Sequence, residues 1–221
     1  MALSRLTYNS LNVTPTASKG IGFDSGADDL AATFSGGAMT FIKKLTASAS
    51  ATLSFVDGAS DVVLDSTYKE YVFTFKHIHP GTEDSTMLQF QGSIDSGSNY
   101  NVAMTTTSFR ALHTEADTTS LAYSASTDLA QGTGFQYLEE GASMGNDNDQ
   151  CLGGTLTLFN PSSTTFVKHF IGRTQFYEAA SGSFEHYTAG YFNTTSAIDE
   201  IQFKMDSGNI DAGTISLYGI N

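Results

Sequence analysis

The amino-acid sequence predicts an all-β protein: an antiparallel β-sandwich of jelly-roll or Greek-key type with an irregular N-terminal arm. Three observations support this fold class. Apolar and polar residues alternate along residues 198–221, and successive side chains on a strand point to opposite faces. The chain contains 21 Gly, 16 Phe and 10 Tyr but only 3 Pro, a composition typical of short strands joined by turns. Few segments keep the 3.6-residue spacing of an amphipathic helix.

The alternation in residues 198–221 is interrupted once. Ser207, Gly208 and Asn209 separate an apolar series that includes Ile201 and Phe203 from a second series further along the chain. Small and polar residues of this kind form turns. We therefore expect two strands joined as a hairpin with one buried face.

The segments from residue 38 onward fit one large domain of about ten strands. Residues 127–140 are the least strand-like part and are expected to hold a short helical turn. Strands are expected near residues 39–45, 51–55, 71–80, 87–91, 102–113, 121–124, 155–160, 165–177, 184–193 and in the final pair.

Residues 1–37 lack sustained periodicity and are rich in Gly, Ser, Thr and Asp. One interpretation is a flexible or irregular surface segment. The other is an arm that becomes ordered on a partner, because its apolar residues are too numerous for a simple linker. The residues that would anchor such an arm are Leu6, Tyr8, Leu11, Phe23 and Phe34.

Charge and cysteine content exclude several classes of function. A formal net charge of −13, with only 10 Lys and Arg, disfavours a nucleic-acid-binding surface. No apolar run is long enough for a transmembrane helix, so no membrane insertion is expected. The N-terminal residues lack an apolar signal core. The single cysteine, Cys151, excludes an intrachain disulfide and suits a reducing cytoplasm.

Residues 198–220 have the form I-x-x-I-x-F-x-x-x-S-G-N-I-x-x-G-T-I-x-L-Y-G-I. This form resembles the closing motif of small β-rich virion proteins and fibre tips of tailed bacteriophages, particularly marine ones. Residues 68–84 (YKEYVFTFKHIHPGTED), 88–100 (LQFQGSIDSGSNY) and 153–173 (GGTLTLFNPSSTTFVKHFIGR) resemble the same group.

The resemblance implies a non-enzymatic virion protein, assembled in the host cytoplasm, that forms a homotrimer and contacts other virion proteins. It leaves two places in the particle open. One is a tail fibre or fibre tip, and the other is a head decoration, cement or head-fibre protein. A carbohydrate-binding or carbohydrate-cleaving β-sandwich used in host recognition is the alternative function. No cofactor is expected.

His77 and His79 form the best candidate metal site. Residues two apart on a strand share a face, so both imidazoles could bind one ion, and a three-fold axis would supply six such ligands. The resemblance supports this idea, because trimeric phage fibres use His-x-His in this way. The alternative is two histidines hydrogen-bonded at a corner where Pro80 ends the strand.

Aromatic residues are concentrated shortly before the final pair of strands. Tyr177, Tyr187 and Tyr191 are the candidate binding residues, because exposed rings stack on sugars, including those of a host-surface glycan, or form hot spots between proteins. Half of the aromatic residues in a strand must face inward, so packing in the core is the competing interpretation.

Catalytic chemistry has little support in the sequence. Cys151 lacks neighbours that would lower its pKa, and it is interpreted as a buried, inert thiol. Glu139 and Glu140 could be considered as a glycosidase pair, but adjacent side chains usually diverge, and a solvated loop is expected there instead. Residues 145–150 carry oxygen ligands but lack the pattern of an EF-hand loop, so a solvated acidic loop is expected.

Overall fold

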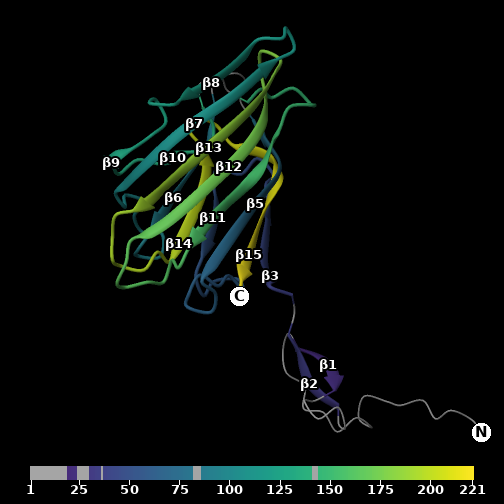
Figure 1. Ribbon diagram of the computed structural model, residues 1–221, viewed down its shortest axis with the longest axis vertical. Coiled ribbons are helices and arrows are strands. Elements are labelled where there is room, and N and C mark those ends of the chain that lie inside the picture. The colour runs from purple at the N-terminus through teal and green to yellow at the C-terminus, as the bar shows by residue number, and fades with distance from the viewer. Residues whose placement is uncertain (1–18, 24–29, 36, 82–85, 141–143) are drawn as a thin grey trace, which may run out of the picture. The chain divides into compact units, whose positions relative to one another are not determined.

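The computed structural model describes residues 19–23, 30–35, 37–81, 86–140 and 144–221 (Figure 1). Backbone contacts divide the chain into two units, Met1–Thr40 and Phe41–Asn221. Within the first unit, β1 (Lys19–Phe23) and β2 (Leu30–Ser35) pair antiparallel as a two-stranded sheet. The segment expected to be irregular therefore contains a short β-hairpin.

Of the predicted anchors of the arm, Phe23 is the last residue of β1 and Phe34 lies in β2. Leu6, Tyr8 and Leu11 lie outside the described residues. Docking through this segment stays a prediction.

The body of the protein is built on a nine-stranded sheet. Its strands follow the order β3-β15-β5-β11-β12-β13-β7-β8, and β9 pairs with β7 beside β8. Figure 1 shows β5, β11, β12, β13 and β7 side by side. The bounds are β3 Met39–Thr46, β5 Glu70–Pro80, β7 Met104–Thr114, β8 Thr119–Tyr123, β9 Ala130–Gly132, β11 Leu152–Phe159, β12 Lys168–Glu178, β13 Gly182–Phe192 and β15 Ile210–Ile220.

A four-stranded sheet packs on one face of the large sheet and completes the predicted sandwich. Its order is β10-β6-β14-β4, and the strand pairs with a described register run antiparallel in both sheets. The bounds are β4 Leu53–Val56, β6 Leu88–Ser93, β10 Gln136–Tyr137 and β14 Glu200–Met205. The all-β sandwich is thus confirmed, and the jelly-roll connectivity stays a prediction.

Phenylalanine rings fill the space between the two sheets. Phe203 of β14 meets Phe55 of β4 and Phe73 and Phe75 of β5, with ring centroids 5.2–6.2 Å apart in edge contacts. Phe90 of β6 contacts Phe170 and Phe192 of the large sheet in the same way, at 5.1 and 6.2 Å. Such edge-to-face contacts add to the free energy gained by burying the rings.

Two expectations about local structure are wrong. The helical turn expected in residues 127–140 is not formed, because β9 and β10 extend the two sheets there. The predicted C-terminal hairpin is also not formed. β14 pairs with β4 and β6, whereas β15 pairs with β5, so the turn at residues 207–209 carries the chain from one sheet to the other.

Candidate functional site

The large sheet has one face against the four-stranded sheet and one face toward solvent, which we call the outer face. Residues on β12 alternate strictly between buried and exposed from Lys168 to Phe176. The phenylalanines Phe176, Phe184 and Phe192 point inward and are fully buried. Tyr177, Tyr187 and Tyr191 have the opposite parity and lie on the outer face, half-buried.

A row of four side chains crosses the outer face, with one residue on each of the adjacent strands β8, β7, β13 and β12. Tyr123 of β8 is opposite Phe109 of β7, Phe109 is opposite Tyr187 of β13, and Tyr187 is opposite Arg173 of β12. We call this set the aromatic row. The rings of Phe109 and Tyr187 are stacked with centroids 4.6 Å apart and planes inclined by 6°.

Arg173 covers the other side of the Tyr187 ring, with its guanidinium carbon 5.3 Å from the ring centroid. Its Nε donates a hydrogen bond to Glu185, and this ion pair raises the pKa of Arg173. With Phe109 on one face of its ring and Arg173 on the other, Tyr187 leaves neither ring face uncovered. This geometry does not suit stacking of a sugar on Tyr187.

The outer face is apolar around β8, the last strand in the order of the large sheet. Leu121 is 76% exposed, Tyr123 57% and Phe109 44%. Ile171 of β12 adds a further exposed side chain, separated from β7 by Ala189 of β13. We call Leu121, Tyr123 and Phe109 the apolar corner, because these three lie on the paired strands β7 and β8. Large exposed apolar clusters of this kind mark interaction surfaces.

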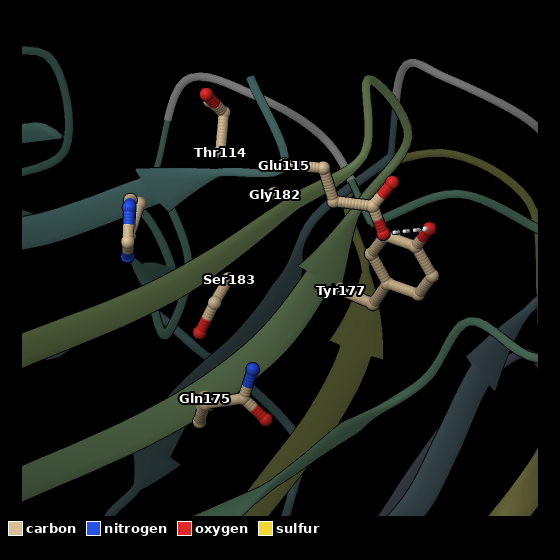
Figure 2. Close-up of a pocket in the computed structure, with 7 residues that line it drawn as sticks. Thr114, Glu115, Gln175, Tyr177, Gly182 and Ser183 are labelled. Atoms are coloured by element: carbon tan, nitrogen blue, oxygen red, sulfur yellow. Dashed lines mark hydrogen bonds between the residues drawn. The ribbon is translucent and has the colours of Figure 1, made fainter. Parts of the chain in front are cut away.

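A shallow hollow of about 400 Å³ lies at one end of the outer face (Figure 2). Figure 2 shows the Tyr177 hydroxyl directed at the Glu115 carboxylate, and its oxygen donates a hydrogen bond to Glu115 Oε1 at 3.3 Å. Gln175 and Ser183 add polar groups from β12 and β13. We call this the polar hollow, lined by His113, Thr114, Glu115, Gln175, Tyr177, Gly182 and Ser183.

Tyr191 lies in a different hollow, of about 460 Å³, with Ile171 and His169 among its lining residues. The His169 ring meets the Tyr191 ring edge-on at 6.0 Å. Tyr187 and Tyr191 are four residues apart on β13, a distance of roughly 13 Å along a strand. Tyr177 lies on β12 opposite Ser183, and Ser183 is four residues from Tyr187 in the other direction along β13. The three predicted tyrosines thus share a face but occupy three separate positions.

His77 and His79 lie near the end of β5, which stops at Pro80 as expected. Both line a hollow of about 330 Å³ with Cys151 and Asp211. The Nε2 atom of His79 is 3.2 Å from the Asp147 carbonyl oxygen, which accepts a hydrogen bond when Nε2 is protonated. Within the described ranges, no three His, Cys, Asp or Glu side chains form a group that could hold a metal ion. The metal site stays a prediction.

The expectation of a solvated loop at Glu139 and Glu140 is wrong. Glu139 is fully buried, its Oε1 accepts a hydrogen bond from the Leu88 N–H at 2.7 Å, and burial raises its pKa to about 8. Glu140 is also buried, accepts a hydrogen bond from Ser124, and lies 3.5 Å from Arg110 Nε. Neither carboxylate lines the hollows described above, so the geometry does not make them a glycosidase pair.

Cys151 is half-buried and lines the hollow of His77 and His79, so it is less enclosed than expected, and burial raises the pKa of its thiol. Lys168 forms no ion pair with a described residue. It is fully buried on the inward face of β12, where its Nζ donates a hydrogen bond to the Thr194 carbonyl at 3.0 Å.

The arrangement on the outer face is suited to binding and assembly. The sequence alone did not identify Phe109, Leu121 or Tyr123 as candidates, although the two-residue spacing of Leu121 and Tyr123 indicates that they share a face. Among the described residues no helix could span a membrane. Comparisons of the chain with protein-family models, curated proteins and solved structures give no match.

Proposed function

We propose that this chain is a non-enzymatic structural protein of a bacteriophage virion, and that it assembles with copies of itself as a homotrimeric appendage. The observation that carries the self-assembly is the apolar corner beside β8. Its side chains expose 44–76% of their surface to solvent, and burying a side chain of this size contributes about 1.5–3 kcal/mol. The resemblance of residues 198–220 to phage virion proteins supports the setting and the trimer.

The edge of the large sheet at β8, which pairs with no further described strand, favours the same location for an interface. β8 is the last strand in the order, and an edge strand leaves backbone N–H and C=O groups available for pairing. The stack of Phe109, Tyr187 and Arg173 is already ordered, so little conformational entropy is lost when a partner covers it.

The mass of the purified protein in solution tests the assembly. The wild-type chain is expected to sediment as a trimer at micromolar concentration. Leu121→Lys should weaken association roughly ten- to hundredfold, because a charge would be buried where an apolar side chain was. Thr195→Lys is the matched control, since Thr195 is exposed outside β7 and β8 and the charge change is identical. A wild-type monomer, or equal loss in both variants, would contradict the proposal.

The place in the virion needs a separate measurement. Antibody labelling of whole particles, viewed by electron microscopy, is expected to mark either the tail tip or the head surface. Labelling of neither structure would argue against a virion protein of any kind.

Carbohydrate binding is the second candidate function, and the polar hollow is the observation that favours it. The hollow combines the ring of Tyr177 with hydrogen-bonding groups of Gln175, Glu115 and Ser183. Binding of a host polysaccharide that is lost in Tyr177→Ala would support this function. Cleavage of the polysaccharide by purified protein would instead support the enzymatic alternative.

A further inference from the structure

A hollow of about 720 Å³ lies on the solvent side of β3, β15 and β5, away from β8. Lys44, Lys76 and His77 line it. Thr74, Ser216 and Tyr218 also line it and add two hydroxyl groups and an aromatic ring. We call it the basic hollow.

A β-bulge in β5 brings Lys76 and His77 to the same hollow. Lys76 is opposite Thr214 and His79 is opposite Ala212, so two residues of β5 stand against the single residue Gly213. Lys76 and His77 are both exposed, whereas Ile78 is fully buried. In a regular strand two successive side chains would point to opposite faces. Bulges of this kind redirect side chains and are frequent next to functional sites.

The bulge requires unusual backbone conformations on both strands. His77 has φ 51°, in the left-handed region that residues with a side chain rarely adopt. Gly213, opposite, has φ 111°, and a Cβ there would lie 2.4 Å from the His77 carbonyl oxygen. Strained conformations of this type persist where the surrounding structure enforces them, and they are concentrated at binding sites.

The positive charge of the basic hollow is unusual for this protein. The chain has only 10 Lys and Arg and a net charge of −13. Arg110 and Arg173 are paired with glutamates, and Lys204 lies 4.4 Å from the ring centroid of Phe135. Lys44 and Lys76, in contrast, form no ion pair with a described residue, and the described lining of the hollow includes no carboxylate. Asp211 lines the neighbouring hollow, which also contains His79.

We propose that the basic hollow binds an acidic saccharide through its carboxylate, sulfate or phosphate group. Lys44 and Lys76 would pair with the anion, and charge-assisted hydrogen bonds of this kind are strong. The hydroxyls of Thr74 and Ser216 match the hydroxyls of a sugar, and the ring of Tyr218 offers an apolar surface. The volume suits a small ligand. This site lies on other strands than the apolar corner and does not depend on the proposed virion function.

The proposal competes directly with the metal site predicted at His77. Two lysine side chains that line the same hollow disfavour a cation at this histidine and favour an anion. Titration calorimetry with glucose 6-sulfate, glucose, inorganic sulfate and zinc chloride separates the possibilities. Glucose 6-sulfate is expected to bind more tightly than either glucose or inorganic sulfate. Zinc is not expected to bind at His77, so adding zinc chloride should leave the affinity for glucose 6-sulfate unchanged.

Substitutions locate the site. Lys76→Gln and Lys44→Gln should each weaken binding of glucose 6-sulfate roughly tenfold, the effect of losing one charged hydrogen bond. Lys69→Gln is the control for net charge, because Lys69 is exposed outside the hollow, and His79→Gln is the control for the neighbouring hollow. Thermal melts of the variants establish that each is folded.

Three results would overturn the proposal. Equal affinity for glucose and glucose 6-sulfate would remove the role of the anion. Equal affinity for inorganic sulfate and glucose 6-sulfate would remove the saccharide. An unchanged affinity in the Lys44→Gln, Lys76→Gln double variant would place the binding elsewhere on the protein.

Discussion

Glu139 and His186 are buried side chains whose ionisation is coupled to folding. Burial raises the pKa of Glu139 from 4.5 to about 8, and it lowers the pKa of His186 from 6.5 to about 4. Neither ring nitrogen of His186 has a hydrogen-bond partner among the described residues. Both groups are therefore most compatible with the fold when they are uncharged.

The two groups have opposite effects on the pH dependence of stability. Between pH 4.5 and about 8 the folded state holds a proton on Glu139 that the unfolded state has lost, so stability falls as pH rises. Between about pH 4 and 6.5 the unfolded state holds a proton on His186 that the folded state lacks, so stability rises with pH.

Glu139→Gln isolates the contribution of the carboxyl group. The amide keeps an oxygen that can accept the hydrogen bond of the Leu88 N–H, and it cannot ionise. We expect the free energies of unfolding of variant and wild type to be similar at pH 5. At pH 9 the variant should be more stable by an amount on the order of a few kcal/mol.

Denaturant unfolding at both pH values provides the measurement. The comparison with wild type at each pH cancels the contribution of His186, which is the same in both proteins. A difference between variant and wild type that does not grow with pH would show that Glu139 is not the buried acid described here.

The two C-terminal strands, β14 and β15, join different sheets and do not pair with each other. The residues on either side of the turn at residues 207–209 have the alternation of a hairpin, but the two strands lie in opposite layers of the sandwich. Alternation predicts that each strand has one buried face. The same alternation is expected whether the two strands pair as a hairpin or lie in different sheets. The local pattern therefore could not distinguish the two arrangements.

Phe203 in β14 is central to the packing of the two sheets. Its ring contacts rings from β4, β5 and β6 and is fully buried. Phe203→Ala should therefore lower the free energy of unfolding by about 3–5 kcal/mol, through lost burial and the cavity left behind.

Phe166→Ala is the matched control for this substitution, because the Phe166 side chain is 69% exposed. We expect a change within about 0.5 kcal/mol for it, measured by the same denaturant unfolding. Similar losses in the two variants would show that the aromatic contacts between the sheets do not hold the sandwich together.

The distribution of charge over the whole molecule gives opposite salt dependences for the two proposed interactions. Copies of a chain with net charge −13 repel one another, so salt should strengthen association through the apolar corner. Binding of an anion at Lys44 and Lys76 should instead weaken, because salt screens that attraction.

Measurements between 20 and 500 mM sodium chloride test this difference. Sedimentation is expected to show a larger oligomeric fraction at high salt, and calorimetry a lower affinity for glucose 6-sulfate. Dissociation of the oligomer by salt would mean that ion pairs, and not the apolar corner, hold it together.

Much of the fold could be predicted from the sequence because alternation is a local property. The strands at residues 71–80 and 184–193 were placed within two residues, and the buried face of residues 198–205 was correct. The two-residue alternation also predicted that Tyr187 and Tyr191 share a face of one strand, but it did not determine whether that face is buried or exposed. The helical turn was wrong because short strands such as β10 are formed by pairing with a distant segment.

The sequence by itself determined the β class, the acidic surface and the parity of side chains along each strand, since these depend on composition and near neighbours. Only the tertiary structure decided which strands pair and which face remains uncovered. It put Glu139 in the core, covered both faces of the Tyr187 ring, and brought His77 to the same hollow as Lys76 through a bulge. The physical reason is that each of these features depends on contacts between residues far apart in the chain, which no local pattern encodes.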